Sequence, residues 1–230
     1  MLSLFRKRQN TMLGVDIDSL SLSLLELTSE GDTFRVEAYA REVLPQSGQI
    51  TKNTKTEDTV DIEAQSQCLE QMIKKGKFST KKAVSAVSSS NIITKQLIMD
   101  GSLNDEEIEN QIILEAERII PYSIEEVSID FDVLGKNEND DTKINVLLVA
   151  CRRQIVDERE SLLNLAGLKP QIIDVTTYAM ERAYPLIASQ LQLKKADSRV
   201  ALVHIGDLFI TLNVLQNGDS IWRQTLCGAS

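Results

Sequence analysis

The feature that most constrains this chain is a segment that occurs twice. The first copy, LGVDIDSLSLSLLEL, spans residues 13–27, and the second, LVHIGDLFITLNVL, spans residues 202–215. Each copy has an apolar run, then Asp16-Ile17-Asp18 or His204-Ile205-Gly206, then apolar residues that alternate with small polar ones. Such alternation is typical of a half-buried strand. We therefore expect two strand–turn–strand hairpins of the same design, far apart in the chain.

The composition is that of a protein with a proper core, since 42% of the 230 residues are hydrophobic. The net charge of −9 argues against a general nucleic-acid-binding protein, which needs a basic face. The cysteines form no CxxC pair, so neither a disulfide framework nor a zinc site is indicated, and a reducing cytoplasm fits best.

No apolar run reaches the roughly 18 residues that span a bilayer. We interpret the basic residues at 6–8 as a solvated tail, with a weak contact to an anionic membrane surface as the alternative.

The first part of the chain predicts three strands and a helix. Strands are expected at 12–16, at 20–24 and at 34–44, with a turn at Gly31-Asp32. Apolar residues then recur every four positions from Val60 to Met72, which predicts an amphipathic helix that ends at Gly76. These elements indicate a mixed sheet covered by a helix.

From Lys82 the pattern changes to a compact α/β unit that we interpret as an insertion. Two short strands are expected around residues 88–91, and the clearest helix of the chain follows Asn104. Asn104 and Glu107 have the spacing of a capping box, and Pro121 ends the helix. The expected buried stripe of this helix consists of Ile108, Ile112, Ala116 and Ile120. Two further strands, EEVSIDFDVLG and KINVLLVACRR, are expected on either side of an acidic turn at 136–142.

After residue 153 the larger pattern resumes. A helix is expected at 155–166, a strand at 171–175, and a second helix through residues 178–186 that Pro185 kinks or shortens. The second hairpin covers residues 199–215, and Asn217-Gly218 predicts a tight return turn into a strand at 221–226.

The two hairpins and the elements between them resemble the phosphate-binding loops of the actin, Hsp70 and sugar-kinase fold. The inserted unit lies where FtsA-like proteins carry their subdomain 1C. The segments LNDEEIENQIILEAERIIPYSIEEVSIDFDVLG and VLLVACRRQIVDERESLLNLAGLKPQIIDVTTYAMERA resemble those of PilM, the FtsA-related protein family of the type IV pilus assembly complex. This resemblance covers nearly the whole chain from Leu13. It implies a two-lobed α/β fold of the ribonuclease H-like, actin-like type whose C-terminal lobe is cut short, because PilM proteins are longer than this chain.

The resemblance also implies a division of the chain. Residues 1–81 would form the first part of subdomain 1A, with the first phosphate hairpin, and residues 82–152 the inserted subdomain 1C. Residues 153–196 would complete subdomain 1A, and residues 197–230 would begin the second lobe, with the second phosphate hairpin.

In the family fold these hairpins bind ATP and Mg²⁺, and the resemblance implies which residues would do so here. In the first hairpin they are Asp16, which would position the metal, together with Asp18, Ser19 and Ser21. In the second hairpin they are His204, Gly206, Asp207 and Thr211.

Four positions depart from the family pattern. Asp18 replaces a small turn residue, and two like charges 4 Å apart repel by about 4 kcal/mol at an effective dielectric of 20. His204 replaces the second acidic residue, although Mg²⁺ prefers oxygen ligands. Ser23 replaces a common lysine, and Thr176 replaces a common acidic residue. We therefore expect a weak, altered or lost ATP site, with an active nucleotide-switching ATPase as the alternative.

The function that the resemblance implies is that of a cytoplasmic scaffold, peripheral at the bacterial inner membrane and held there by its partners. The expected partner is the cytoplasmic N-terminal peptide of the inner-membrane protein PilN, held in a groove between subdomains 1A and 1C as an extended peptide on a sheet edge with apolar anchors. Candidate contact residues are Ile92, Ile93, Leu97, Leu148, Arg152, Arg153 and Leu162. Other inner-membrane pilus assembly proteins and self-association are further expected contacts, and a scaffold of a type II secretion or competence machine is the third alternative.

Overall fold

The computed structural model describes residues 11–31, 33–45, 62–188, 199–206 and 209–227. The predictions for the basic residues at 6–8, the turn residue Asp32, the helix start at Val60 and the site residue Asp207 lie outside these ranges. Contacts between residues divide the chain into two units: Met1–Ser89 with Arg159–Ser230, and Ser90–Glu158.

The first unit contains a sheet of five described strands in the order β3-β2-β1-β4-β8. The strands are β1 (Leu13–Ile17), β2 (Ser21–Glu30), β3 (Thr33–Val43), β4 (Lys82–Val87) and β8 (Lys169–Val175). The first three form an antiparallel meander, while β4 pairs in parallel with both β1 and β8. Parallel neighbours need a long crossover connection, and the helices of this unit supply it.

Helices α1 (Ile62–Lys75) and α3 (Arg153–Leu165) contribute to the core of this sheet. Leu22 and Leu24 of β2 are completely buried and belong to one cluster with residues of both helices. The helix residues of this cluster are Leu69, Met72, Leu162 and Leu163. The alternation of serine and leucine at the start of β2 thus places Leu22 and Leu24 on the face that the helices cover.

A second sheet in the same unit repeats the meander. It consists of β9 (Arg199–Ile205), β10 (Phe209–Gln216) and β11 (Asp219–Cys227), in the order β11-β10-β9. The turn between β10 and β11 is confirmed, since Asn217 and Gly218 have φ values of 58° and 100°. Two successive positive φ values give the twist that a two-residue hairpin needs.

Helix α4 (Thr176–Ala188) connects the two sheets in sequence and carries Pro185 inside it. The described helix extends three residues past Pro185, to Ala188, and whether Pro185 bends it stays a prediction. Proline lacks the N–H that would donate to the carbonyl oxygen of Glu181, four residues earlier.

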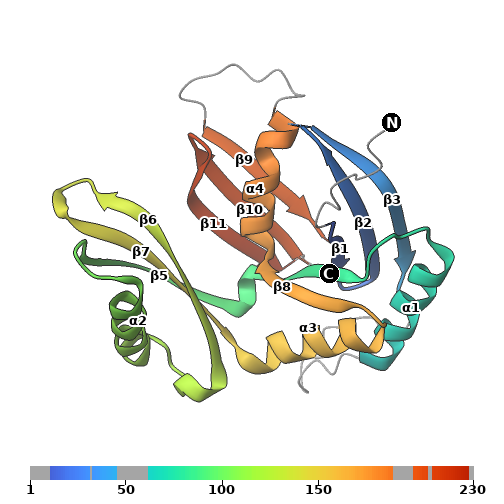
Figure 1. Cartoon of the computed structure of the whole chain (residues 1–230), viewed down its shortest axis with the longest axis horizontal. Helices are drawn as coiled ribbons and strands as arrows, with labels where there is room; N and C mark the ends of the chain where they lie inside the picture. The colour runs from blue at the N-terminus through green and yellow to red at the C-terminus, as the bar shows by residue number, and fades with distance from the viewer. Residues whose placement is uncertain (1–10, 32, 46–61, 189–198, 207–208, 228–230) are drawn as a thin grey trace, which may run out of the picture. The chain divides into compact units, whose positions relative to one another are not determined.

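The second unit contains β5 (Ile92–Asp100), β6 (Val127–Asn137), β7 (Asp140–Arg152) and helix α2 (Asp105–Ile119), with 3-10 turns at Ser89–Asn91 and Ile124–Glu126. Its described strands are ordered β5-β7-β6. Figure 1 shows α2 beside one face of this sheet, and Ile108, Ile112 and Ala116 pack there against Val146 and Leu148. The predicted buried stripe of α2 is confirmed.

The predicted capping box of α2 is also confirmed. The Glu107 N–H donates to Asn104 Oδ1 at 3.1 Å, and the Asn104 N–H donates to Glu107 Oε2 at 2.9 Å. Two free N–H groups at the start of the helix are thereby satisfied by local sequence alone.

Two predictions about the inserted region need correction. The strand at Lys82 does not belong to it, because β4 pairs with β1 and β8 in the five-stranded sheet. The acidic turn is shorter than 136–142, because β6 extends to Asn137 and β7 starts at Asp140. Backbone pairing extends both strands through polar residues that the hydrophobic pattern had assigned to a turn.

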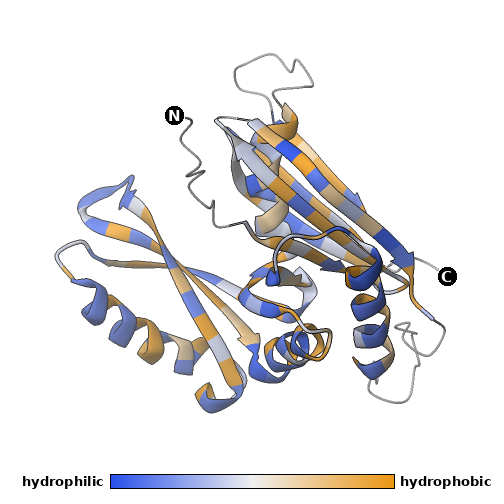
Figure 2. Cartoon of the chain, turned by 45° about the vertical axis from the view of Figure 1, so that its right-hand side comes forward, coloured by the Kyte–Doolittle hydropathy of each residue, from blue (hydrophilic) through white to orange (hydrophobic). Residues whose placement is uncertain are grey.

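The hydropathy of the residues alternates along the strands of the sheets. Figure 2 shows hydrophobic and hydrophilic residues in alternation along many of the strands. Within the described ranges, none of the helices has both the length and the apolar character that a membrane crossing requires.

Candidate functional site

The two hairpins that the sequence predicted have the same backbone design. In the first, Asp16 is opposite Ser23 and the Asp18 N–H donates to the Ser21 carbonyl oxygen at 2.9 Å. In the second, His204 is opposite Thr211 and the Gly206 N–H donates to the Phe209 carbonyl oxygen at 2.9 Å. Asp16 therefore corresponds to His204, and Asp18 corresponds to Gly206.

The two turns lie against each other through Asp18 and Gly206. A Cβ atom added to Gly206 would lie 3.0 Å from Asp18 Oδ2, 3.4 Å from Asp18 Oδ1 and 3.2 Å from the Phe209 carbonyl oxygen. The Asp18 carboxylate also accepts a hydrogen bond from the Ser19 N–H at 2.7 Å. Its negative charge is thus held where the first turn meets the second.

Asp16 lies at the end of β1 among other charged residues. Partial burial of its carboxyl group and repulsion by Asp18 raise the pKa of Asp16, while His204, Arg159 and Arg41 act in the opposite direction. The residue as a whole is exposed, so solvent limits the size of this effect. Ser21 is buried and accepts a hydrogen bond from Arg41 Nη2 at 3.1 Å.

We tested whether these residues fit ATP and Mg²⁺. Triphosphate binding needs backbone N–H groups directed at the ligand and a close approach at glycine. In this site the Asp18 carboxylate lies against Gly206, and the N–H groups of Asp18, Ser19 and Gly206 already have partners within the protein. The described residues of the two hairpins therefore place a carboxylate, rather than free N–H groups, where the turns meet, and this arrangement does not favour a triphosphate.

A second candidate site is a hollow of about 230 Å³ in the second unit. It lies where β5 begins and β7 ends, next to the segment that follows α2. Its lining combines apolar and polar side chains. The lining residues are Ser90, Asn91, Ile92, Ile93, Tyr122, Val127, Ala150, Cys151, Arg152 and Ile155.

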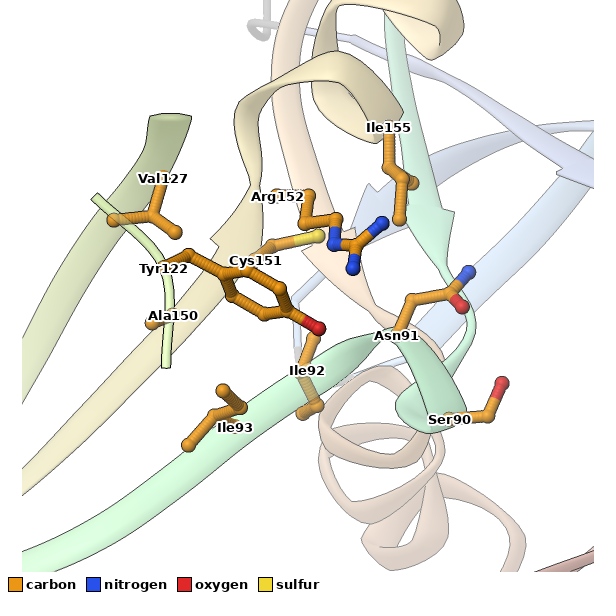
Figure 3. Close-up of a pocket in the computed structure, with 10 residues that line it drawn as sticks. All are labelled: Ser90, Asn91, Ile92, Ile93, Tyr122, Val127, Ala150, Cys151, Arg152 and Ile155. Carbon is orange, nitrogen blue, oxygen red and sulfur yellow. The ribbon is translucent and has the colours of Figure 1, made fainter. Parts of the chain in front are cut away.

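Arg152 and Tyr122 form the polar side of this hollow. The Arg152 guanidinium carbon lies 4.2 Å from the centroid of the Tyr122 ring, and Figure 3 shows the guanidinium group between that ring and Asn91. A cation over an aromatic face is held electrostatically, which orients the guanidinium group. Burial raises the pKa of Cys151 in the same hollow, so its thiol is not activated as a nucleophile.

The structure brings together only some of the predicted partner-binding residues. Ile92, Ile93 and Arg152 line the hollow. Leu97 packs against the core of the second unit, and Arg153 donates a hydrogen bond to the Val127 carbonyl oxygen at 3.2 Å. Leu148 and Leu162 need correction, because they are buried in two different hydrophobic clusters and present no side chain to a partner.

Tyr122 and Val127 line the hollow but were missed by sequence reasoning. Tyr122 directly follows Pro121, which ends α2, and an aromatic residue immediately after a helix stop was the available signal. Val127 begins β6, and its alternation with polar residues indicated a strand but not a pocket.

A comparison of the sequence with models of protein families shows the family to which this chain belongs. The sequence model of the family described as "Type IV pilus assembly protein PilM" matches residues 14–229. The chain belongs to the PilM family. The resemblance to the PilM family that the motifs indicated is therefore confirmed.

Solved structures show the fold of this PilM chain. The structure described as "PilM-PilN type IV pilus biogenesis complex" matches with a TM-score of 0.75 and 24% identity, covering 94% of this chain and 61% of that chain. The cytoplasmic domain of EpsL, an inner-membrane component of the type II secretion system of Vibrio cholerae, matches with a TM-score of 0.52 and 12% identity, covering 94% and 71%. The fold is the predicted actin-like α/β fold, and this PilM chain spans 61% of the length of the first of these structures.

Proposed function

We propose that this chain is the actin-like scaffold of a type IV pilus inner-membrane complex, and that the hollow beside Arg152 holds the cytoplasmic N-terminal peptide of a PilN-type partner. Membership of the PilM family supports the pilus role. The matched structure is described as a complex of PilM with PilN, which supports PilN as the class of partner. A bound membrane protein would also keep this chain at the cytoplasmic face of the inner membrane.

The hollow carries this proposal because it combines apolar lining residues with the start of an edge strand. Strand β5 pairs with β7 on one side and has no described strand on the other. An extended peptide can continue such a sheet with backbone hydrogen bonds while an apolar side chain enters a pocket. Ile92 and Ile93 supply apolar contacts, and the Arg152 guanidinium group supplies donors for carbonyl or carboxylate oxygens.

A titration of the full-length protein with the N-terminal peptide of its own PilN tests the proposal. Ile92→Asp places a charge in the hollow and should weaken binding at least tenfold, measured by fluorescence anisotropy or calorimetry. Ile98→Asp is the matched control, because Ile98 lies on the same strand, is 64% exposed and does not line the hollow. Absence of wild-type binding at hundreds of micromolar, or an equal loss in both variants, would contradict the proposal.

A further inference from the structure

At the contact between the two hairpins, a carboxylate lies beside a backbone N–H group and a glycine. The Asp18 carboxylate accepts the Ser19 N–H at 2.7 Å, and both of its oxygens lie near the position of a Cβ atom on Gly206. A phosphate group bound between two such turns would make the same contacts, with a backbone N–H on one side and the surface of a glycine on the other.

The equivalence of the hairpins makes this arrangement informative. Asp18 corresponds to Gly206, so the same turn position carries a carboxylate in one copy and no side chain in the other. The missing side chain of Gly206 provides the space, and the Asp18 side chain fills it.

We propose that the Asp18 carboxylate is a built-in anion that occupies the phosphate position and closes the paired hairpins of this chain to polyphosphate ligands. A triphosphate would have to displace the carboxylate from the Ser19 N–H and then remain beside its charge. Both costs oppose nucleotide binding. The two hairpins are instead joined by an internal contact that needs no nucleotide, which suits a scaffold of constant shape.

Titration of the full-length protein with Mg-ATP tests the proposal. Asp18→Ser removes the charge and opens the space beside Gly206, so we expect affinity for ATP to rise at least tenfold over the wild type. Asp132→Ser is the matched control, because it removes the same charge from an exposed position on β6 and should leave ATP affinity unchanged. Inorganic tripolyphosphate without Mg²⁺ is the second ligand, since its binding needs the turns but not a metal at His204.

Hydrogen exchange reports on the contact independently of any ligand. The Ser19 amide should exchange faster in Asp18→Ser than in the wild type, while Asp18→Asn, whose amide oxygen still accepts, should keep most of the protection. Two outcomes would overturn the proposal: tight wild-type ATP binding that no Asp18 substitution changes, or no gain for either polyphosphate in Asp18→Ser. The PilN peptide titration is a separate measurement on the other unit, so failure of one proposal is distinguishable from failure of the other.

Discussion

The guanidinium group of Arg152 lies over the ring of Tyr122, at 4.2 Å from its centroid. Arg152 ends β7, whereas Tyr122 follows the proline that ends α2. Their contact connects the sheet of the second unit to the segment after its helix. It also forms one side of the hollow in which we place the partner peptide.

Substitution of either residue should weaken peptide binding without unfolding the protein. Tyr122→Ala and Arg152→Ala each remove a lining group, and truncation of such anchors typically costs about 1–2 kcal/mol, or roughly fivefold to thirtyfold in affinity. Calorimetric titration with the PilN peptide measures this loss. Arg118→Ala is the control, because Arg118 is an exposed residue of α2 paired with Glu115. A similar loss in Arg118→Ala would show that the effect is not local to the hollow.

The stability of the second unit should depend on pH through Asp100. Hydrogen bonds from the Ser102 hydroxyl and backbone N–H, followed by Lys143, lower the pKa of Asp100 from 3.8 to about 2. A carboxyl group with a lower pKa in the folded state stabilises that state above its unfolded pKa, and this contribution is lost as pH falls from about 4 to about 2. Urea midpoints at pH 5, 4, 3 and 2 measure it. Asp100→Asn should show a smaller fall than the wild type, and equal slopes would contradict this assignment.

Loss of the α2 cap should be measurable and specific. Asn104→Ala removes the acceptor for the Glu107 N–H and should destabilise the protein by about 1 kcal/mol. Asn104→Gly should destabilise the protein by only about a few tenths of a kcal/mol, because glycine is itself tolerated at the N-cap position. Chemical denaturation compares the two variants. Equal losses would mean that the side-chain hydrogen bond contributes little.

Truncation of a buried side chain should destabilise the sheet of the second unit far more than truncation of an exposed one. Leu148 is completely buried against α2, so Leu148→Ala should lower the free energy of unfolding by about 2–5 kcal/mol. Ile98→Ala, on an exposed side chain of the same sheet, should stay within about 0.5 kcal/mol of the wild type. The comparison uses denaturant titrations under identical conditions.

A side chain at Gly206 should strain the contact between the hairpins. In Gly206→Ala the new Cβ atom would lie 3.0 Å from Asp18 Oδ2 and 3.2 Å from the Phe209 carbonyl oxygen. We expect a loss of about 1–3 kcal/mol, as for other overpacked sites. The same substitution made in Asp18→Ser should cost less, because one of the two crowding groups is gone. A double-mutant cycle by thermal denaturation measures the difference.

Features that depend on neighbours in sequence were predictable from the sequence. The Asn104–Glu107 capping box and the Asn217-Gly218 turn are examples, because their hydrogen bonds and dihedral angles involve residues within one helical or hairpin turn. The repeated hairpins were also predictable, since each needs only an alternating pattern around a turn. The family motifs supplied the identity of the fold.

Strand pairing and side-chain burial were decided by the tertiary structure. Strand β4 pairs with β1 and β8, and no local pattern marked it as part of that sheet rather than the insertion. Leu148 and Leu162 were candidates for partner contacts by type, but packing buries both, because their side chains lie on the covered faces of their elements. Tyr122 lines the hollow and contacts Arg152, a residue 30 positions further along the chain.

In the paired hairpins, too, some features followed from the sequence and others only from the tertiary structure. The sequence by itself determined that the chain has paired hairpins with Asp18 in one turn and Gly206 at the matching position of the other. Only the tertiary structure decided that the Asp18 carboxylate lies against Gly206. The physical reason is that the sequence specifies which chemical groups a side chain carries, whereas the neighbours of that side chain are set by the packing of segments that are distant in the chain.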